Sequence, residues 1–288
     1  MIEACCQLDV HGQLAGISIE PAAPQRWAAV LVSAGLVPKF GPYRLYAELA
    51  RRLARDGFFT LRFDLGDVGD SRQAHVGQPL EERTRLEIGA AVEHVNARQG
   101  IEGVVLAGLC SGAEDSFRYA EHDPRIGALV LVDPFSYRTS GWTWRHAVHR
   151  LVRRSMRLLR LYQPLEYHRS GAARLGNTVG PSRLTYQRMP HAESSRILKV
   201  LLDRGVHVHF VYTGGSSESF NYTGQLRAMF PGIDFKGLVT VDHLSHIDHT
   251  QPLQQDRDCL VDLIGRRLLP LARRTARRHA WSLQSSAI

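Results

Sequence analysis

Short apolar runs alternate with amphipathic stretches along most of the chain. The apolar runs cover residues 28–33, 58–64, 104–107 and 128–132. The helical patterns between them cover residues 43–56, 81–99 and 111–121. Continuous apolar strands separated by helices are typical of a parallel sheet that is buried on both faces. The pattern therefore predicts an α/β fold with a mostly parallel central sheet and helices on both sides.

The pattern changes at three places and divides the chain. Residues 3–20 alternate and turn at His11-Gly12, which predicts an antiparallel edge hairpin. The strand signal lapses at Pro134 and returns at 206–212, and again near 235–241. The residues from Gly265 onward are predicted to be a helix end followed by a basic, then Ser-rich tail that is partly disordered. The predicted organisation is a core of residues 1–133 and 205–270, an inserted cap of residues 134–204, and a tail of residues 271–288.

Composition agrees with a globular protein that has a large core. The chain has 288 residues, of which 44% are hydrophobic and 22% are charged. Residues 1–24 lack the plan of a signal peptide, and no apolar run approaches the roughly 18–20 residues that span a bilayer. A cytoplasmic location is therefore expected. The four cysteines are too few for a disulfide framework and lack metal-ligand spacing.

The net charge of +8 comes largely from arginine, and the basic residues concentrate at 145–160 and 266–278. Such a charge suits an acidic partner, an anionic membrane surface or nucleic acid. Neither basic stretch alternates with the aromatic groups that grooves for single-stranded nucleic acid use. Nucleic acid is therefore not expected as a partner.

The strongest chemical signal is a strand, residues 104–107, that runs directly into a helix through Gly108-Leu109-Cys110-Ser111-Gly112. A nucleophile on so sharp a strand-to-helix turn has a strained backbone, and small residues are required two positions before and after it. The helix N-terminus also favours the thiolate form of cysteine. Cys110 is therefore the predicted nucleophile, whereas Ser111 has Leu109 two positions before it and does not fit. The alternative is that Cys110 is an inert buried thiol.

The catalytic base is expected late in the chain, where residues 241–250 contain three histidines. His249, just before the last helix, has the position of a general base for Cys110. His243 and His246 are predicted to be loop residues. A metal site at His246 and His249 lacks an acidic or sulfur partner at convincing spacing, so no metal and no cofactor is expected.

A third group should orient His249, and the sequence offers two acids. Glu218 is the only acid in the segment 212–218, after the first strand that follows the cap. Asp133 lies at the end of the preceding strand, from which a carboxylate can also reach the histidine. We favour Glu218 from the sequence, with Asp133 as the alternative.

Backbone amides are the expected stabilisers of an oxyanion. The amide of Ser111 follows the nucleophile directly and would supply one donor. The second should come from the loop after the first parallel strand, residues 33–37, where Gly35 lets the backbone turn and Leu36 is the predicted donor. The loop at 62–71 is predicted to be a structural turn.

These motifs, in this order, resemble those of the α/β-hydrolases, and in particular bacterial members similar to the serine aminopeptidase and exosortase-associated hydrolase groups. The resemblance rests on Ser-Ala-Gly-Leu at 33–36, the 62–71 loop, Gly-Leu-Cys-Ser-Gly-Ala, Val-Asp-Pro and Asp-His-Thr, and it spans most of residues 27–265 apart from the cap. It implies the α/β-hydrolase fold and a triad of Cys110, an acid and His249. Most of the family has serine at this turn, whereas dienelactone hydrolases and polyhydroxyalkanoate synthases have cysteine.

A cysteine nucleophile exchanges acyl groups readily with thioesters. The sequence therefore predicts a small-molecule acyl substrate and a thioesterase or esterase, with an acyltransferase or a noncatalytic interaction protein as alternatives. The cap contains a helical stretch in which apolar residues share one face and arginines share the other, the latter being Arg150, Arg153, Arg154 and Arg157. This basic face is either simply solvated or docks an acidic acyl carrier protein or the phosphates of coenzyme A. Contact with a membrane surface is a further hypothesis.

Overall fold

The computed structural model describes residues 1–288 except 9–12, 25, 74, 76, 159–188 and 286–288. Side chains are not described for residues 153–154, 156–158 and 272–285. The basic residues Arg153, Arg154 and Arg157 therefore lie outside the described side chains.

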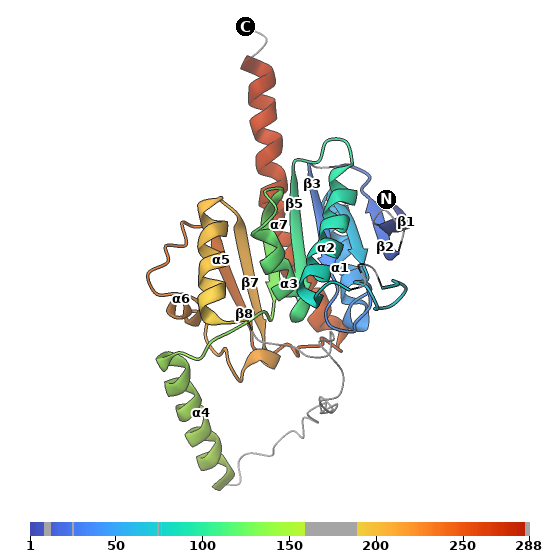
Figure 1. The fold of residues 1–288 in the computed structure, drawn as a ribbon. Helices are drawn as coiled ribbons and strands as arrows, with labels where there is room; N and C mark the ends of the chain where they lie inside the picture. The colour runs from blue at the N-terminus through green and yellow to red at the C-terminus, as the bar shows by residue number, and fades with distance from the viewer. Residues whose placement is uncertain (9–12, 25, 74, 76, 159–188, 286–288) are drawn as a thin grey trace.

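The described strands form one sheet of eight in the order β1-β2-β4-β3-β5-β6-β7-β8 (Figure 1). The strands are β1 (Ile2–Leu8), β2 (Leu14–Glu20), β3 (Trp27–Val32), β4 (Phe59–Phe63), β5 (Gly103–Leu109), β6 (Ile126–Val132), β7 (His207–Thr213) and β8 (Val239–Leu244). Strand β2 pairs antiparallel with both β1 and β4, and every other strand pair is parallel. The prediction of an edge hairpin on a mostly parallel sheet is confirmed.

Helices cover both faces of the sheet, as the apolar strands require. They are α1 (Leu45–Arg55), α2 (Leu80–Asn96), α3 (Ser111–Ala120), α4 (Ser140–Leu158), α5 (His191–Asp203), α6 (Gln225–Met229) and α7 (Gln254–Ser285), with 3-10 turns η1 (Pro42–Arg44) and η2 (Gly214–Ser216). The buried side chains of α2, α3 and α5 pack on one face, and those of α1 and α7 pack on the other.

Strand register places the ends of the central strands at one edge. Val32 of β3 pairs with Gly108 of β5, and Leu109 pairs with Val132 of β6. Val132 pairs in turn with Val211 of β7. The loops that follow these strands therefore meet at the carboxyl edge of the sheet, where ligands bind in open α/β sheets.

Two predicted segments differ from the structure. Helix α5 lies within the predicted cap, residues 134–204, yet Ile197, Leu198 and Leu201 are fully buried in the core. The apolar positions of α5 fit a helix of the sheet layer as well as they fit a cap. The predicted helix end near Gly265 is wrong, because α7 continues to Ser285 through a stretch rich in Ala, Arg and Leu, which favour helix.

No helix in the described part of the chain combines the length and the apolar character needed to cross a membrane.

Candidate active site

Cys110 occupies the strained turn between β5 and α3. Its backbone has φ 54° and ψ −119°, a conformation that costs free energy for a residue with a side chain. The Cys110 amide donates a hydrogen bond of 2.8 Å to the carbonyl of Val132 and so ties the turn to β6. A Cβ atom on Gly108 would lie 2.3 Å from the backbone of Gly112, and one on Gly112 would lie 2.5 Å from the carbonyl oxygen of Val32. The two glycines are therefore required by contact, as the motif predicts.

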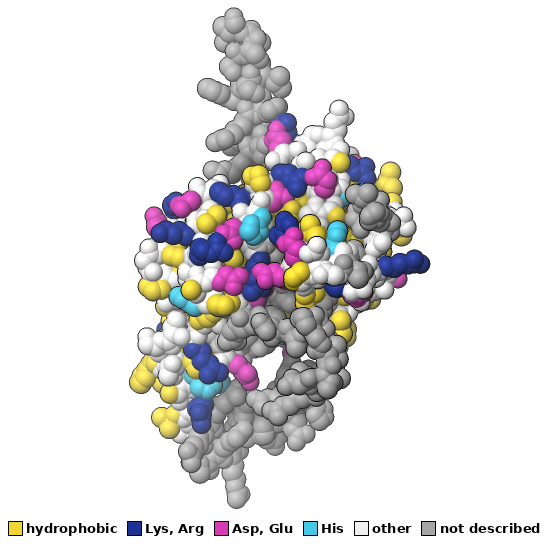
Figure 2. Space-filling model, viewed as in Figure 1, with side chains coloured by type: hydrophobic (Ala, Val, Ile, Leu, Met, Phe, Trp, Pro, Cys, Tyr) yellow, Lys and Arg dark blue, Asp and Glu magenta, His cyan; other side chains and the backbone are white. Residues whose placement is uncertain are grey.

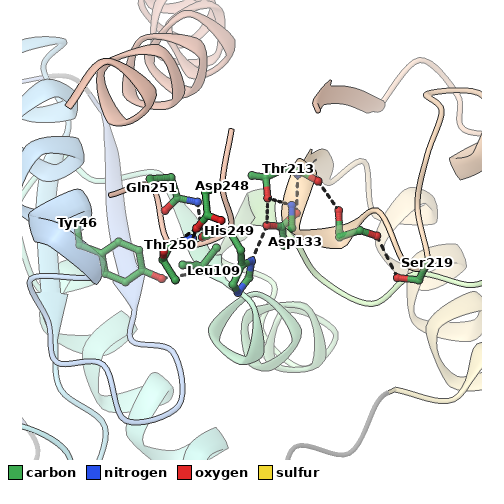
Figure 3. Close-up of polar contacts among 11 residues, drawn as sticks. Tyr46, Leu109, Asp133, Thr213, Ser219, Asp248, His249, Thr250 and Gln251 are labelled. Carbon is green, nitrogen blue, oxygen red and sulfur yellow. Dashed lines mark hydrogen bonds and ion pairs between the residues drawn. The ribbon is translucent and has the colours of Figure 1, made fainter. Parts of the chain in front are cut away.

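His249 reaches Cys110 from the loop after β8. The His249 imidazole is hydrogen-bonded to the Cys110 side chain. Its Nδ1 lies 2.7 Å from Oδ2 of Asp133 (Figure 3). The hydrogen bond with Asp133, followed by that with Cys110, raises the pKa of His249 to about 10. The imidazole is therefore protonated at neutral pH. The His243 side chain is half-buried in β8 instead of lying in a loop as predicted.

Asp133, at the end of β6, contacts the histidine in place of Glu218. Its carboxylate is buried and accepts hydrogen bonds from the Thr213 amide and hydroxyl, both 2.6 Å, besides the one from His249. The backbone of Asp133 has φ 46° and its amide donates to Val211, which turns the side chain at the strand end toward β7. The preference for Glu218 as the partner of His249 was wrong.

Glu218 is exposed beyond η2, and its backbone carbonyl accepts a hydrogen bond from Arg138. The chain between β7 and Glu218 instead packs by its backbone against the histidine. A Cβ on Gly215 would lie 2.3 Å from the Cβ of His249. The segment thus supplies the wall behind His249, while the acid comes from the neighbouring strand.

Local hydrogen bonds hold the loop that carries His249. Asp248 accepts from the amide and the hydroxyl of Thr250 at 2.8 and 2.7 Å, which closes a tight turn around the histidine. The Gln251 side chain donates to the carbonyl of His249, and Arg257 of α7 donates to the carbonyl of Gln251. The base is therefore fixed to α7 as well as to Asp133.

The Ser111 hydroxyl has a structural partner next to the nucleophile. Ser111 Oγ accepts a 2.7 Å hydrogen bond from the amide of Gly35, which has φ 54°. This contact joins α3 to the loop after β3, where Leu36 lies. Leu36 and Ser111, the two predicted oxyanion donors, line the same cavity as Cys110. The geometry of an oxyanion at these two amides stays a prediction.

A buried ion pair that no sequence pattern indicates also fixes the loop after β3. Lys39 Nζ lies 2.6 Å from Asp64 and 2.5 Å from Asp70, and the Lys39 amide also donates to Asp64. Burial acts to lower the pKa of Lys39, but the two carboxylates outweigh burial and raise it. Asp64 belongs to the Arg-Phe-Asp-Leu-Gly motif of the 62–71 loop, which is predicted to be a structural turn. Its ion pair with Lys39 therefore ties that turn to the loop after β3.

Tyr46 of α1 lies beneath the turn. Its hydroxyl accepts a 2.8 Å hydrogen bond from the amide of Leu109 (Figure 3). The hydroxyl also donates one of 3.0 Å to the carbonyl of Val32. The side chain is buried, and burial raises the pKa of the Tyr46 hydroxyl far above its usual value. Tyr46 therefore bridges the ends of β3 and β5 where the two strands separate to form the site. An isolated tyrosine in an amphipathic helix gives no sequence signal for this role.

A cavity of about 600 Å³ opens beside Cys110. One part of its wall is apolar and consists of Leu36, Val37, Pro42, Leu65, Pro79 and Leu80. The other part carries Glu81, Glu114, Asp115 and Arg118. Cys110 and His249 both line it, so a molecule in the cavity can reach the sulfur.

The site brings together the Cys110 sulfur, the protonated imidazole of His249 and the buried carboxylate of Asp133 beside a cavity whose wall is partly apolar. This is the general arrangement of a nucleophile, its base and the group that orients the base. Among the described residues there is no group of three His, Cys, Asp or Glu side chains placed to hold a metal ion.

A scan against models of protein families and a search of curated proteins found no match to this chain. A search of solved structures found several hydrolases of the same fold. An esterase of Pyrococcus furiosus aligns with a TM-score of 0.58 and 11% identity over 93% of this chain and 90% of its own. The esterase Est1E of Butyrivibrio proteoclasticus aligns with a TM-score of 0.54 and 13% identity over 92% and 98%. A serine hydrolase of Xanthomonas campestris, described as lacking a lid, aligns with a TM-score of 0.54 and 14% identity over 95% and 94%. The chain has the α/β-hydrolase fold, as the sequence motifs predict.

Proposed function

We propose that this protein is an acyl-processing hydrolase, a thioesterase or esterase that forms an acyl-enzyme on Cys110. The observation that carries the proposal is the continuous contact from Cys110 through His249 to the buried Asp133, at the mouth of the cavity. The esterases and serine hydrolases of the same fold support the reaction class. The triad of the proposal is Cys110, His249 and Asp133.

In the first half of the reaction, the Cys110 thiolate attacks the carbonyl carbon of an acyl thioester or ester. The amides of Ser111 and Leu36 stabilise the oxyanion that forms. The bond from the carbonyl carbon to the leaving sulfur or oxygen then breaks, and the protonated His249 gives its proton to the leaving group. The product of this half is a thioester between the acyl group and Cys110.

In the second half, neutral His249 takes a proton from water as the water attacks the thioester. The bond from the acyl carbon to sulfur breaks, and Cys110 leaves as a thiolate while His249 again carries a proton. The free acid departs, and Asp133 keeps the imidazole oriented throughout. The apolar part of the cavity wall suits the acyl chain, and a sulfur nucleophile exchanges acyl groups readily with thioesters, which favours thioesters over peptides.

Intact mass spectrometry after exposure to a panel of acyl thioesters and esters tests the proposal. The wild type is expected to gain the mass of one acyl group, and Cys110→Ala is expected to gain none. Cys259→Ala is the matched control, because Cys259 is another partly buried free cysteine in α7 and should leave the adduct unchanged. An adduct that persists in Cys110→Ala would rule the proposal out.

The same incubation separates hydrolysis from acyl transfer. Release of free acid that no alcohol or amine acceptor alters supports hydrolysis. Acyl-acceptor product formed at the expense of the acid would instead identify an acyltransferase with the same acyl-enzyme. A noncatalytic protein of this fold would form neither product, and its biological function would survive Cys110→Ala.

A further inference from the structure

Among its described residues, helix α4 contacts the core through its first two turns. Trp142 is buried, and its carbonyl accepts a hydrogen bond of 3.2 Å from the side chain of Asn221. The Trp142 indole stacks on His146 and donates to the carbonyl of Ser217. From there α4 projects away from the sheet, and no other helix of the described residues lies beside it (Figure 1).

Away from these contacts, one face of α4 is an exposed apolar stripe. It consists of Trp144, Val148, Leu151 and Val152, which are 69%, 40%, 67% and 48% exposed. Their spacing of four, three and one residues places them on a single face of the helix. Large apolar side chains gathered on one surface mark an interaction site more often than scattered ones do.

The rest of α4 is strongly basic. Residues 140–158 include five arginines and no aspartate or glutamate. Arg145 lies over the ring of Tyr222 at 4.1 Å, and Arg150 is exposed. Figure 2 shows dark blue and yellow side chains together in this part of the molecule. An apolar face that carries tryptophan and leucine beside arginines is the pattern of a helix that lies in a membrane interface.

Other exposed apolar side chains lie at the same edge of the sheet. Leu36, Phe40 and Tyr43 follow β3, and Leu253 follows β8; they are 48–58% exposed. Because these parallel strands and β6 end at one edge, the loops and α4 belong to the same end of the molecule as the Cys110 cavity. The remaining exposed large apolar side chains of the described residues are Met1 and Ile2, in the edge hairpin.

We propose that α4 binds the surface of an anionic lipid bilayer. The stripe of Trp144, Val148, Leu151 and Val152 enters the boundary between headgroups and acyl chains, and the exposed Arg150 pairs with lipid phosphates. A bilayer is deformable and accommodates a convex helix together with separate apolar loops, whereas a folded acidic protein would need a matching groove. The binding turns the mouth of the cavity toward the lipid, and it does not depend on the chemistry at Cys110.

Sedimentation of the full chain with lipid vesicles tests the proposal. Vesicles of equal parts phosphatidylcholine and phosphatidylglycerol are expected to bind the wild type, and less so at high salt, whereas pure phosphatidylcholine binds it weakly. The variant Leu151→Glu is expected to bind the mixed vesicles at least about tenfold more weakly, because a leucine that enters the bilayer is replaced by a charge. Ile2→Glu is the matched control, since Ile2 is 72% exposed at the edge hairpin and should bind like the wild type.

Several outcomes would overturn the proposal. These are failure of the wild type to bind the mixed vesicles, or equal binding by Leu151→Glu. Binding of an acidic acyl carrier protein that Arg150→Glu abolishes and Leu151→Glu does not, without vesicle binding, would assign α4 to a protein partner. Circular dichroism of both variants confirms that the fold is intact.

The fluorescence of Trp144, taken as the difference between the wild type and Trp144→Phe, provides a second readout. A shift to shorter wavelength when vesicles are added is expected. A short-wavelength emission without vesicles, unchanged by them, would mean that the stripe is already covered within the protein, and would contradict the proposal. Cys110→Ala should bind vesicles like the wild type, so the membrane proposal and the proposed catalysis fail separately.

Discussion

The carboxylate of Asp133 lies 2.7 Å from Nδ1 of His249, although 116 residues separate the two in the chain. The contact joins the end of β6 to the loop after β8. It explains why His249 holds a proton at neutral pH, and in the proposed reaction it lets the histidine start as an acid.

Replacing Asp133 by asparagine should lower kcat/KM for acyl thioester hydrolysis by about 10³–10⁴-fold, because the amide cannot stabilise the imidazolium or hold the correct tautomer. The rates of hydrolysis of a soluble thioester by both forms check this. Glu218→Gln is the control and should change the rate by less than about twofold, as expected for an exposed side chain. A larger loss of kcat/KM in Glu218→Gln than in Asp133→Asn would identify Glu218 as the acid that acts with His249.

The pKa of His249, near 10 in the folded chain against 6.5 for a free histidine, should limit activity on the alkaline side. The pH profile of kcat/KM is expected to fall as pH rises through about 10, where His249 loses the proton that the leaving group needs. In Asp133→Asn this limb should move toward neutral pH. A wild-type profile that falls near pH 6.5 would contradict the assignment.

The same shift links His249 to stability. A pKa that is raised on folding stabilises the native state fully below about pH 6.5, and the contribution is lost as pH rises through about 10. Urea unfolding of the wild type and His249→Gln at several pH values should therefore show a difference that shrinks above neutral pH. A stability difference between the two forms that grows toward alkaline pH would contradict the raised pKa of His249.

Replacing Cys110 by serine should not produce an ordinary serine hydrolase. A serine hydroxyl must give up its proton during attack. Asp133, the largest cause of the raised pKa of His249, remains in the variant and disfavours the neutral imidazole that would accept this proton. The expected loss in kcat/KM is at least about 10²-fold, the contribution of a working general base. Steady-state rates for thioester and ester substrates measure it, and near wild-type ester hydrolysis by Cys110→Ser would show that His249 is neutral at rest.

Tyr46→Phe removes the hydroxyl that joins Leu109 to Val32 beneath the nucleophile. It leaves the buried Leu109 amide without that partner, which should cost about 1–3 kcal/mol of unfolding free energy. Because the turn that carries Cys110 loosens while the cavity wall stays, kcat should fall more than KM rises. Denaturant unfolding and steady-state kinetics check both effects, with the exposed Tyr43→Phe as the control.

The sequence by itself determined the strands, the turn and its two glycines, because the apolar pattern and the glycine spacing are local features of the chain. Continuous apolar runs separated by helices are typical of parallel strands buried on both faces, and Gly108 and Gly112 flank Cys110 within one turn. The placement of His249 also followed from its position after the last strand.

Only the tertiary structure decided which acid completes the site. Asp133 and Glu218 follow neighbouring strands that end at the same edge, so their spacing in the sequence is equally suitable. The positive φ of Asp133 and the two donors of Thr213 on β7 turn its carboxylate toward His249. The contacts of Tyr46, Lys39 and the Ser111 hydroxyl are likewise made between segments far apart in the chain, and no local pattern of residues records them.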